Sequence, residues 1–234
     1  MPKLYLIPAP LTESGGIPIA EAFLPEIYQL KHFIVERSKT SRAYIKSLKH
    51  PLPQSELEVM EMDKHKGHGM LPEMLEWFDQ GKDIGVLSEA GCPGIADPGA
   101  NVVRKAHDMN YEVIAIPGPS AIFLALMASG MNGQNFCFHG YLPVDEGERM
   151  AELKKIESDS KHFQRTMIWI ETPYRNNRMA ESCLKTLQAS TRLCIAVDLT
   201  GADQWVKSSK IAEWKKSDLP DMHKLPAVYC LLAP

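Results

Sequence analysis

The chain lacks several features that would assign it to a broad class of protein. No stretch approaches the roughly 18 consecutive apolar residues that a membrane span requires, and the first apolar run, 4–7, is typical of a strand rather than a signal peptide. The five cysteines are odd in number and include no Cys-x-x-Cys pair, so no disulfide framework is expected. These absences, together with an ordinary globular composition, predict a cytoplasmic protein.

An excess of positive charge is also missing. The sequence holds 26 lysines and arginines against 29 aspartates and glutamates, a net charge of −3, so any contact with RNA must come from a local patch. His65 and His68 lie in a polar loop without a third ligand at a recognisable spacing, and no metal site is expected there. No Gly-x-Gly-x-x-Gly follows the first strand, which argues against a dinucleotide-binding dehydrogenase.

The most informative stretch that is present is a compact loop of small residues. Residues 88–99 have the sequence SEAGCPGIADPG and directly follow the apolar run 83–87, which is typical of a buried strand in a parallel sheet. Their glycines and prolines interrupt regular structure, and residues 101–109 then indicate a helix. Because open α/β sheets bind ligands at the carboxyl ends of their strands, the loop is a candidate ligand site, although a structural turn fits the same pattern.

The length of the chain fits one large domain or two small ones. In the first half, strands alternate with helices of about ten residues, which predicts a mostly parallel sheet with helices on both faces. The second half contains a helix at 121–129, a polar and mobile segment at 145–149 and a charged helix that follows it. The expected strands are 4–7, 32–36, 57–62, 83–87 and 111–116, then 135–143, 166–171, 193–197 and 227–232.

The sequence motifs of the loops resemble those of a known family. SEAGCPGIADPG is similar to the SDAGTP-x-I-x-DPG signature of the tetrapyrrole methylase superfamily, whose members are methyltransferases that depend on S-adenosylmethionine (SAM). Residues 117–121 match the family's P-G-P-[CS]-A, and the segments GYLP, ETPYR and DLT follow in the family's order. The branch that it resembles most methylates a cytidine 2′-hydroxyl in small-subunit ribosomal RNA.

This resemblance implies two α/β domains, at 1–117 and 118–234, with a mixed sheet in the second. It further implies a SAM cleft between the domains, SAM as cofactor and a homodimer. It also places the cofactor-binding residues on the small loops and on strand ends of the second domain. The residues implied are Pro10, Ser88, Glu89, Cys92, Pro93, Ile95, Ser120, Ala121, Glu171 and Ala227.

Transfer of a methyl group to a hydroxyl is assisted by a general base. Glu36 and Asp198 are the candidates, because each follows a strand and faces the expected crevice; a surface or helix-capping carboxylate is the competing interpretation of both. Three cations, Lys39, Arg42 and Lys46, share one face of a predicted helix with Lys49 and are candidate phosphate ligands, although a solvated face has the same pattern. Tyr174 and Arg175 are candidates to stack on a substrate or clamp it.

Several positions differ from the family's sequence motifs. Arg37 stands in place of an acid, Lys39 and Glu89 differ from the signature residues, and Gly201 replaces an expected lysine. Two other interpretations therefore stay open. One is a methyltransferase of the same fold that acts on a corrin or porphyrin precursor or another small molecule, and the other is a SAM- or RNA-binding protein without catalysis.

Overall fold

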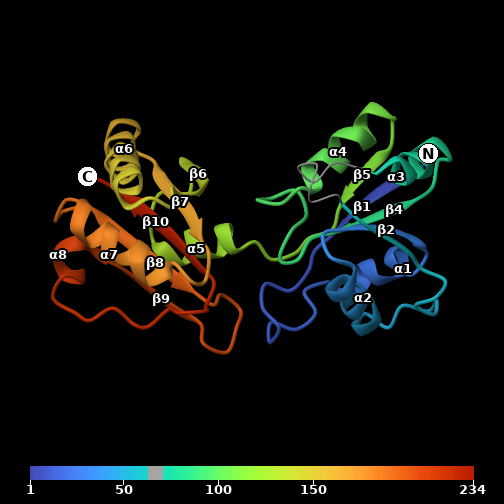
Figure 1. Ribbon diagram of the computed structural model, residues 1–234, viewed down its shortest axis with the longest axis horizontal. Helices are drawn as coiled ribbons and strands as arrows, with labels where there is room; N and C mark the ends of the chain where they lie inside the picture. Colours follow the sequence, from blue (N-terminus) through green and yellow to red (C-terminus); the bar gives the residue numbers. More distant parts are fainter. Residues whose placement is uncertain (63–70) are drawn as a thin grey trace. The chain divides into compact units, whose positions relative to one another are not determined.

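The computed structural model describes residues 1–62 and 71–234, and its contacts divide the chain into two compact units, Met1–Ser120 and Ala121–Pro234 (Figure 1). The loop with His65 and His68 lies outside the described residues. Within the described ranges, no helix is long and apolar enough to cross a membrane.

The first unit is built on a sheet of five parallel strands in the order β3-β2-β4-β1-β5. The three inner strands, β2, β4 and β1, are short and mostly buried, as expected for strands that are covered on both faces, whereas the edge strands β3 and β5 have exposed residues at their ends. The predicted parallel sheet is therefore confirmed. Its strands are β1 (Lys3–Ile7), β2 (His32–Val35), β3 (Glu58–Glu61), β4 (Ile84–Leu87) and β5 (Glu112–Ala115).

Helices cover both faces of this sheet (Figure 1). Side chains alternate across the strands, so Tyr5 and Ile7 belong to one buried cluster and Leu4 to the other. The first cluster is closed by α1 (Leu24–Ile27), which a short 3₁₀ turn precedes, and by α2 (Ser38–Ser47). The second is closed by α3 (Pro72–Asp79) and α4 (Gly99–Asp108).

The two central strands, β1 and β4, mark the point where the winding of the sheet reverses. They are neighbours, but the chain leaves β1 toward the face of α1 and α2, and leaves β4 toward the face of α4. Such a reversal opens a crevice outside the carboxyl ends of the two strands, which is where open α/β sheets bind their ligands. The loops that follow β1 and β4 are therefore the part of this unit most suited to bind one.

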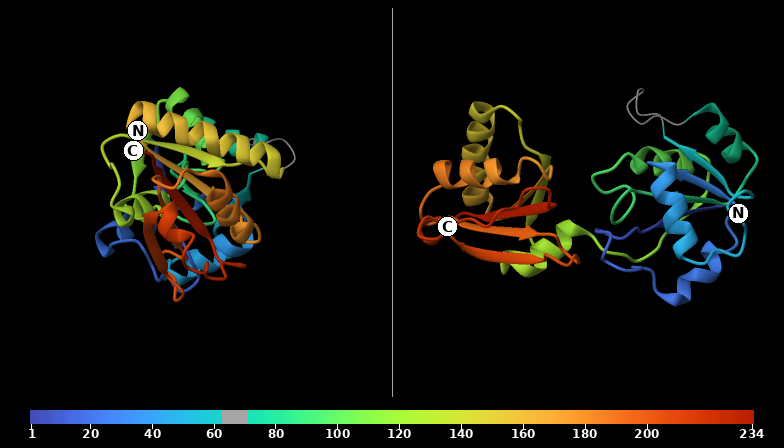
Figure 2. Two further views of the ribbon diagram at one scale, coloured as in Figure 1. Left: turned by 90° about the vertical axis from the view of Figure 1, so that its left-hand side faces the viewer. Right: turned by 60° about the horizontal axis from the view of Figure 1, so that its bottom comes forward.

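The second unit contains a mixed sheet, as predicted, and its strands have the order β6-β7-β10-β8-β9. Only β6 and β7 run parallel, and the other neighbours are antiparallel. Helix α5 (Ala121–Ser129) packs on one face, while α6 (Glu146–Phe163) and α7 (Asn176–Thr186) pack on the other with α8 (Ile211–Trp214) (Figure 2). The strands are β6 (Phe136–Tyr141), β7 (Thr166–Glu171), β8 (Arg192–Val197), β9 (Trp205–Lys210) and β10 (Ala227–Leu232).

One local prediction for this unit is wrong, and two elements are additional to the predicted ones. The segment 145–149, expected to be mobile, is the capped start of α6: the Asp145 carboxylate accepts a hydrogen bond from the backbone nitrogen of Glu148 at 2.9 Å. A polar segment before a charged helix is what a strong N-cap produces. Strand β9 and helix α7 were not predicted, because neither has a long apolar pattern.

Candidate functional site

Three loops meet at the carboxyl ends of β1, β4 and β5. Ala9, after β1, and Gly91, after β4, exchange two backbone hydrogen bonds, of 2.9 and 3.1 Å between nitrogen and oxygen. The Cys92 thiol donates to the carbonyl oxygen of Pro119, after β5, at 3.3 Å. The structure thus brings together the loops that carry all of the cofactor-binding residues predicted in this unit, namely Pro10, Ser88, Glu89, Cys92, Pro93, Ile95 and Ser120.

The backbones of these loops approach each other so closely that only glycine fits at two positions. A Cβ atom on Gly118 would lie 2.1 Å from the Cβ atom of Pro8, and Gly91 has a φ of +73°, which disfavours any other residue. The Tyr44 hydroxyl of α2 donates to the Pro8 carbonyl at 2.8 Å, and burial raises the pKa of Tyr44, so this donor stays protonated. The loops are consequently a fixed cradle of backbone and small side chains.

The loop after β4 is held in shape by the carboxylate of Asp97. Its Oδ1 atom accepts hydrogen bonds from the backbone nitrogens of Gly94 and Gly99, at 2.6 and 2.8 Å. Burial raises the pKa of Asp97, and these two hydrogen bonds oppose the shift. Asp97 belongs to the DPG part of the loop motif, but the motif alone does not indicate that its carboxylate holds the loop.

We expect the Asp97→Asn variant to be as stable as the wild type at pH 7, because an amide oxygen can accept the same two hydrogen bonds. A carboxyl group with a raised pKa in the folded state takes up a proton on folding. Its contribution to stability is therefore largest below its ordinary pKa and is lost as the pH rises through the raised value. Urea unfolding between pH 4 and 7 should show that Asp97→Asn lacks this dependence.

The control for this prediction is Asp108→Asn, at an exposed aspartate at the end of α4. It should keep the pH dependence of the wild type. Asp97→Ala, which removes both hydrogen bonds, should lower the free energy of unfolding by about 1–3 kcal/mol. An Asp97→Asn variant as unstable as Asp97→Ala would show that the negative charge itself holds the loop.

The end of β2 carries a network of charged and polar side chains that joins the loop after β4. The Glu36 carboxylate accepts a hydrogen bond from the backbone nitrogen of Glu89 at 3.0 Å. The Glu89 carboxylate in turn accepts a hydrogen bond from the Thr40 hydroxyl and lies 3.5 Å from Nε of Arg37. Arg37 and Glu89, two residues that differ from the family's motifs, thus form one ion pair. The sequence did not indicate this pair, because the two residues lie in separate segments.

The predicted cationic stripe is only partly available. Lys39 and Lys46 are exposed on α2, but the Arg42 guanidinium donates to the carbonyl oxygens of Gln54 and Leu57, at 2.7 and 3.3 Å. Lys49 lies beyond the end of α2. Arg42 therefore ties α2 to the following segment, and Lys39 and Lys46 remain the candidates for phosphate contact.

In the second unit, the predicted site residues gather where β7 and β8 end beside the start of β10. Ala227 pairs with Glu171 on one side and with Val197 on the other, and the backbone nitrogen of Asp198 donates to the carbonyl oxygen of Pro226. Ala121 begins helix α5 of this unit.

Glu171 and Arg175, predicted to bind cofactor and substrate, bind each other. The Arg175 guanidinium donates through Nε and Nη2 to one carboxylate oxygen of Glu171, at 2.8 and 2.5 Å. The Glu171 side chain is only 1% exposed. Of the predicted substrate pair, Tyr174 therefore remains free, with 70% of its surface exposed.

The second candidate base, Asp198, belongs to a tight turn. Its carboxylate accepts a hydrogen bond from the backbone nitrogen of Asp203 at 2.9 Å and packs on Gly201, where a Cβ atom would lie 2.1 Å from the carboxylate. Any side chain at position 201 would collide with the Asp198 carboxylate, so this turn requires glycine there. Asp198 itself is 7% exposed, so Glu36 has the more accessible carboxylate of the two candidates.

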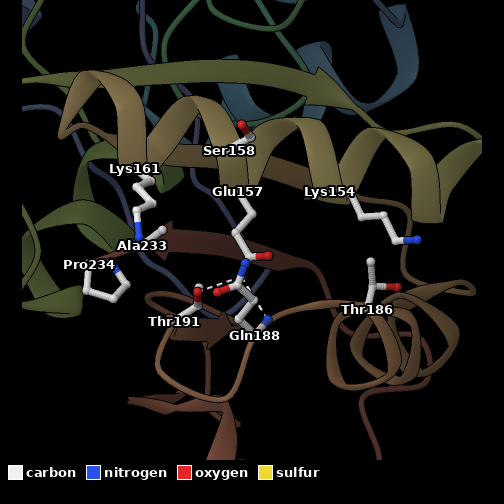
Figure 3. Close-up of a pocket in the computed structure, with 9 residues that line it drawn as sticks. All are labelled: Lys154, Glu157, Ser158, Lys161, Thr186, Gln188, Thr191, Ala233 and Pro234. Carbon is white, nitrogen blue, oxygen red and sulfur yellow. Dashed lines mark hydrogen bonds between the residues drawn. The ribbon is translucent and has the colours of Figure 1, made fainter.

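A cavity of about 390 Å³ in the second unit lies between α6, the end of α7 and the last residues of the chain. The Glu157 carboxylate points across it and accepts hydrogen bonds from the backbone nitrogen of Gln188 and the hydroxyl of Thr191, at 2.9 and 2.5 Å (Figure 3). The Glu157 carboxylate thus joins α6 to the segment before β8. No predicted site residue lines the cavity. The described residues hold no cluster of three metal-ligating side chains.

Comparison with known proteins gives a consistent assignment. The family model described as "Tetrapyrrole (Corrin/Porphyrin) Methylases" matches residues 41–215. A protein of Buchnera aphidicola named "Ribosomal RNA small subunit methyltransferase I" is 33% identical over 163 residues, which is 68% of this chain and 56% of that protein. The protein of the same name from Bacillus subtilis is 28% identical over 218 residues, 92% of this chain and 70% of that protein.

Solved structures show a similar fold. The crystal structure of the methyltransferase CobJ superposes with a TM-score of 0.61 at 14% sequence identity, over 99% of this chain and 92% of that one. At this identity the likeness supports the fold alone. The match to the first of the curated relatives spans about half of that relative's length.

Proposed function

Because the chain belongs to the tetrapyrrole methylase family, we propose that it transfers a methyl group from SAM to a ribose 2′-hydroxyl of small-subunit ribosomal RNA in the cytoplasm. Tetrapyrrole methylases use SAM, which confirms the predicted cofactor for the family. The observation that carries the proposal is the cradle of three loops at the reversal point of the sheet. The acceptor is inferred from relatives named as ribosomal RNA methyltransferases. A homodimer stays a prediction.

The cradle fits a cofactor of this kind. Gly118 and Gly91 let the loops after β1, β4 and β5 pack closely on one another, which fixes their backbones at the carboxyl ends of the strands, where a small molecule would bind. The Thr12 hydroxyl, in the loop after β1, is buried without a hydrogen-bond partner. A buried hydroxyl without a partner costs free energy unless a ligand or water satisfies it. We propose that these loops hold SAM; the roles of Ala121, Glu171 and Ala227 in binding stay predictions.

Bound SAM would supply a methyl group on a positively charged sulfur, so the protein needs no nucleophile of its own. What the chain must supply is alignment of the acceptor and removal of its proton. Glu36 lies at the end of β2, beside the loop after β4, with one carboxylate oxygen bound to the Glu89 nitrogen. We propose that its carboxylate accepts the proton of the acceptor hydroxyl. Burial raises the pKa of the Cys92 thiol, which disfavours the thiolate that a nucleophilic cysteine would need.

The first experiment measures cofactor binding and methyl transfer separately. Isothermal titration calorimetry should show about one SAM bound per chain. Labelled SAM should then transfer its methyl group to small-subunit ribosomal RNA from cells that lack the protein, and mass spectrometry should place it on a ribose 2′-oxygen. The Gly118→Val variant is the matched negative control, because its side chain would collide with Pro8.

A small-molecule acceptor is the second candidate. It is favoured by the acidic side chains Glu36 and Glu89 at the strand ends and by the engagement of Arg42 within the fold, both unfavourable for phosphates. The same assay with corrin and porphyrin precursors distinguishes the two acceptors. SAM binding without transfer to any of them would leave the non-catalytic interpretation, and no SAM binding at millimolar ligand would contradict the proposed function.

A further inference from the structure

An exposed aromatic pair joins the turn after β7, which carries Tyr174, to the segment before β10, which carries His223. The Tyr174 and His223 rings are 5.6 Å apart between centroids and inclined by 69°, an edge-to-face contact. Tyr174 is 70% exposed and His223 is also exposed, so neither ring belongs to the core. The pair therefore presents aromatic surface to solvent at a position where the core gains nothing from it.

The backbone beneath these rings is fixed from both sides. Four hydrogen bonds join segment 221–225 to the turn 173–177. They run from the backbone nitrogen of Lys224 to the Pro173 oxygen (3.1 Å), from Asn176 Nδ2 to the Leu225 oxygen (2.6 Å), from the Met222 nitrogen to Asn177 Oδ1 (2.9 Å) and from Asn177 Nδ2 to Asp221 Oδ1 (2.8 Å).

Two further features support a fixed arrangement. Met222 is 1% exposed and anchors the segment in the core. Lys224 adopts a φ of +66°, a conformation that residues other than glycine rarely adopt and that persists only where the surroundings impose it. A flat ligand that stacks on the aromatic pair would therefore meet a preorganised surface and would not have to order it.

The two segments that carry the pair hold charges of both signs. Arg178 and Lys224 have exposed side chains. The carboxylate of Asp221 accepts hydrogen bonds from the Asn177 amide and from the backbone nitrogen of His223, and these contacts lower the pKa of Asp221, so it stays negatively charged at neutral pH. Arg175 takes no part, because Glu171 holds its guanidinium.

We propose that Tyr174 and His223 form a stacking platform for an unpaired nucleobase of the RNA acceptor. This inference rests on the proposed function, since it assumes an RNA acceptor. Single-stranded bases are commonly bound on exposed aromatic rings, with nearby cations on the phosphates. The sequence did not indicate that His223 belongs to this platform, because only the fold brings it beside Tyr174.

The test uses a ten-nucleotide single-stranded RNA that contains 2-aminopurine, whose fluorescence is quenched by stacking. Wild-type protein should bind it and quench it. Tyr174→Ala should bind about tenfold more weakly and lose the quenching, since one base–aromatic stack is worth about 1–3 kcal/mol. Tyr174→Phe, which keeps the ring, should bind within about twofold of the wild type, and His223→Ala should be intermediate.

Tyr141→Ala is the matched control, because it removes another exposed tyrosine of the same unit, 57% exposed on β6. It should change neither affinity nor quenching. A Tyr174→Ala variant that binds and quenches like the wild type would overturn the platform, even if the wild type methylates RNA. Failure of the wild type to methylate any RNA while it binds SAM would overturn the proposed function.

The cofactor's own adenine is the other source of a base. Calorimetry with SAM should therefore give the same affinity for Tyr174→Ala as for the wild type. A variant that loses SAM affinity and keeps RNA affinity would overturn the proposal and assign the pair to the cofactor.

Discussion

Replacement of Glu36 by glutamine is expected to lower kcat for methyl transfer by about 10²- to 10⁴-fold, the usual contribution of a general base. The glutamine oxygen can still accept the hydrogen bond from the backbone nitrogen of Glu89, so the loop after β4 should keep its position. SAM affinity should therefore stay unchanged while the proton acceptor is lost. Single-turnover kinetics with labelled SAM, beside calorimetry, separates these two effects.

Two variants serve as controls for Glu36. Glu58→Gln, at an exposed carboxylate at the other end of the neighbouring strand, should leave kcat unchanged. Asp198→Asn should have a smaller effect than Glu36→Gln, because the Asp198 carboxylate is engaged by its own turn. A kcat for Glu36→Gln within about threefold of the wild type would remove Glu36 as the base, and a large loss for Asp198→Asn would assign the role there.

Replacement of Arg175 by methionine is expected to lower the free energy of unfolding of the second unit by about 3–5 kcal/mol. It would leave the Glu171 carboxylate, 1% exposed, without its cation in the interior. Urea unfolding followed by tryptophan fluorescence reports mainly on this unit, since Trp169, Trp205 and Trp214 lie in it and Trp77 lies in the first unit.

The loss should be much smaller in two comparison variants. Lys185→Met removes a surface ion pair with Glu146, where both side chains are about 60% exposed, and such pairs contribute about 0–1 kcal/mol. Combining Arg175→Met with Glu171→Gln should restore much of the stability, because the unpaired charge is gone. If Arg175→Met unfolds like Lys185→Met and weakens RNA binding instead, Arg175 has the substrate role that the sequence suggested.

The sequence was a good guide to the first unit because its signals are local. Apolar strands followed by glycine-rich loops place Gly91 and Gly118 at strand ends, and the parallel sheet follows from the alternation with helices. The structure adds that the two loops and Pro8 are in direct contact. In the second unit, β9 escaped detection, since its sequence WVKSSK lacks the apolar alternation typical of a half-buried strand.

The site was harder to predict, because the partners of its side chains come from distant segments. Arg37 looked like a damaging departure from the family's motif, yet it pairs with Glu89, which follows the neighbouring strand β4. Gly201 looked like the loss of a lysine, yet the Asp198 carboxylate occupies the space that any side chain would need. Spacing along the sequence says nothing about such pairs, since they depend on which strands become neighbours.

The central position of β1 has a consequence for how the protein is made. Its two neighbours, β4 and β5, are synthesised long after it, and the exchange of hydrogen bonds between Ala9 and Gly91 needs all of β4 in place. At the usual 5–20 residues per second, the ribosome takes on the order of ten seconds to get from the end of β1 to the end of β4. During that interval β1 is an apolar strand with two unpaired edges, a segment prone to aggregation and a natural target for chaperones.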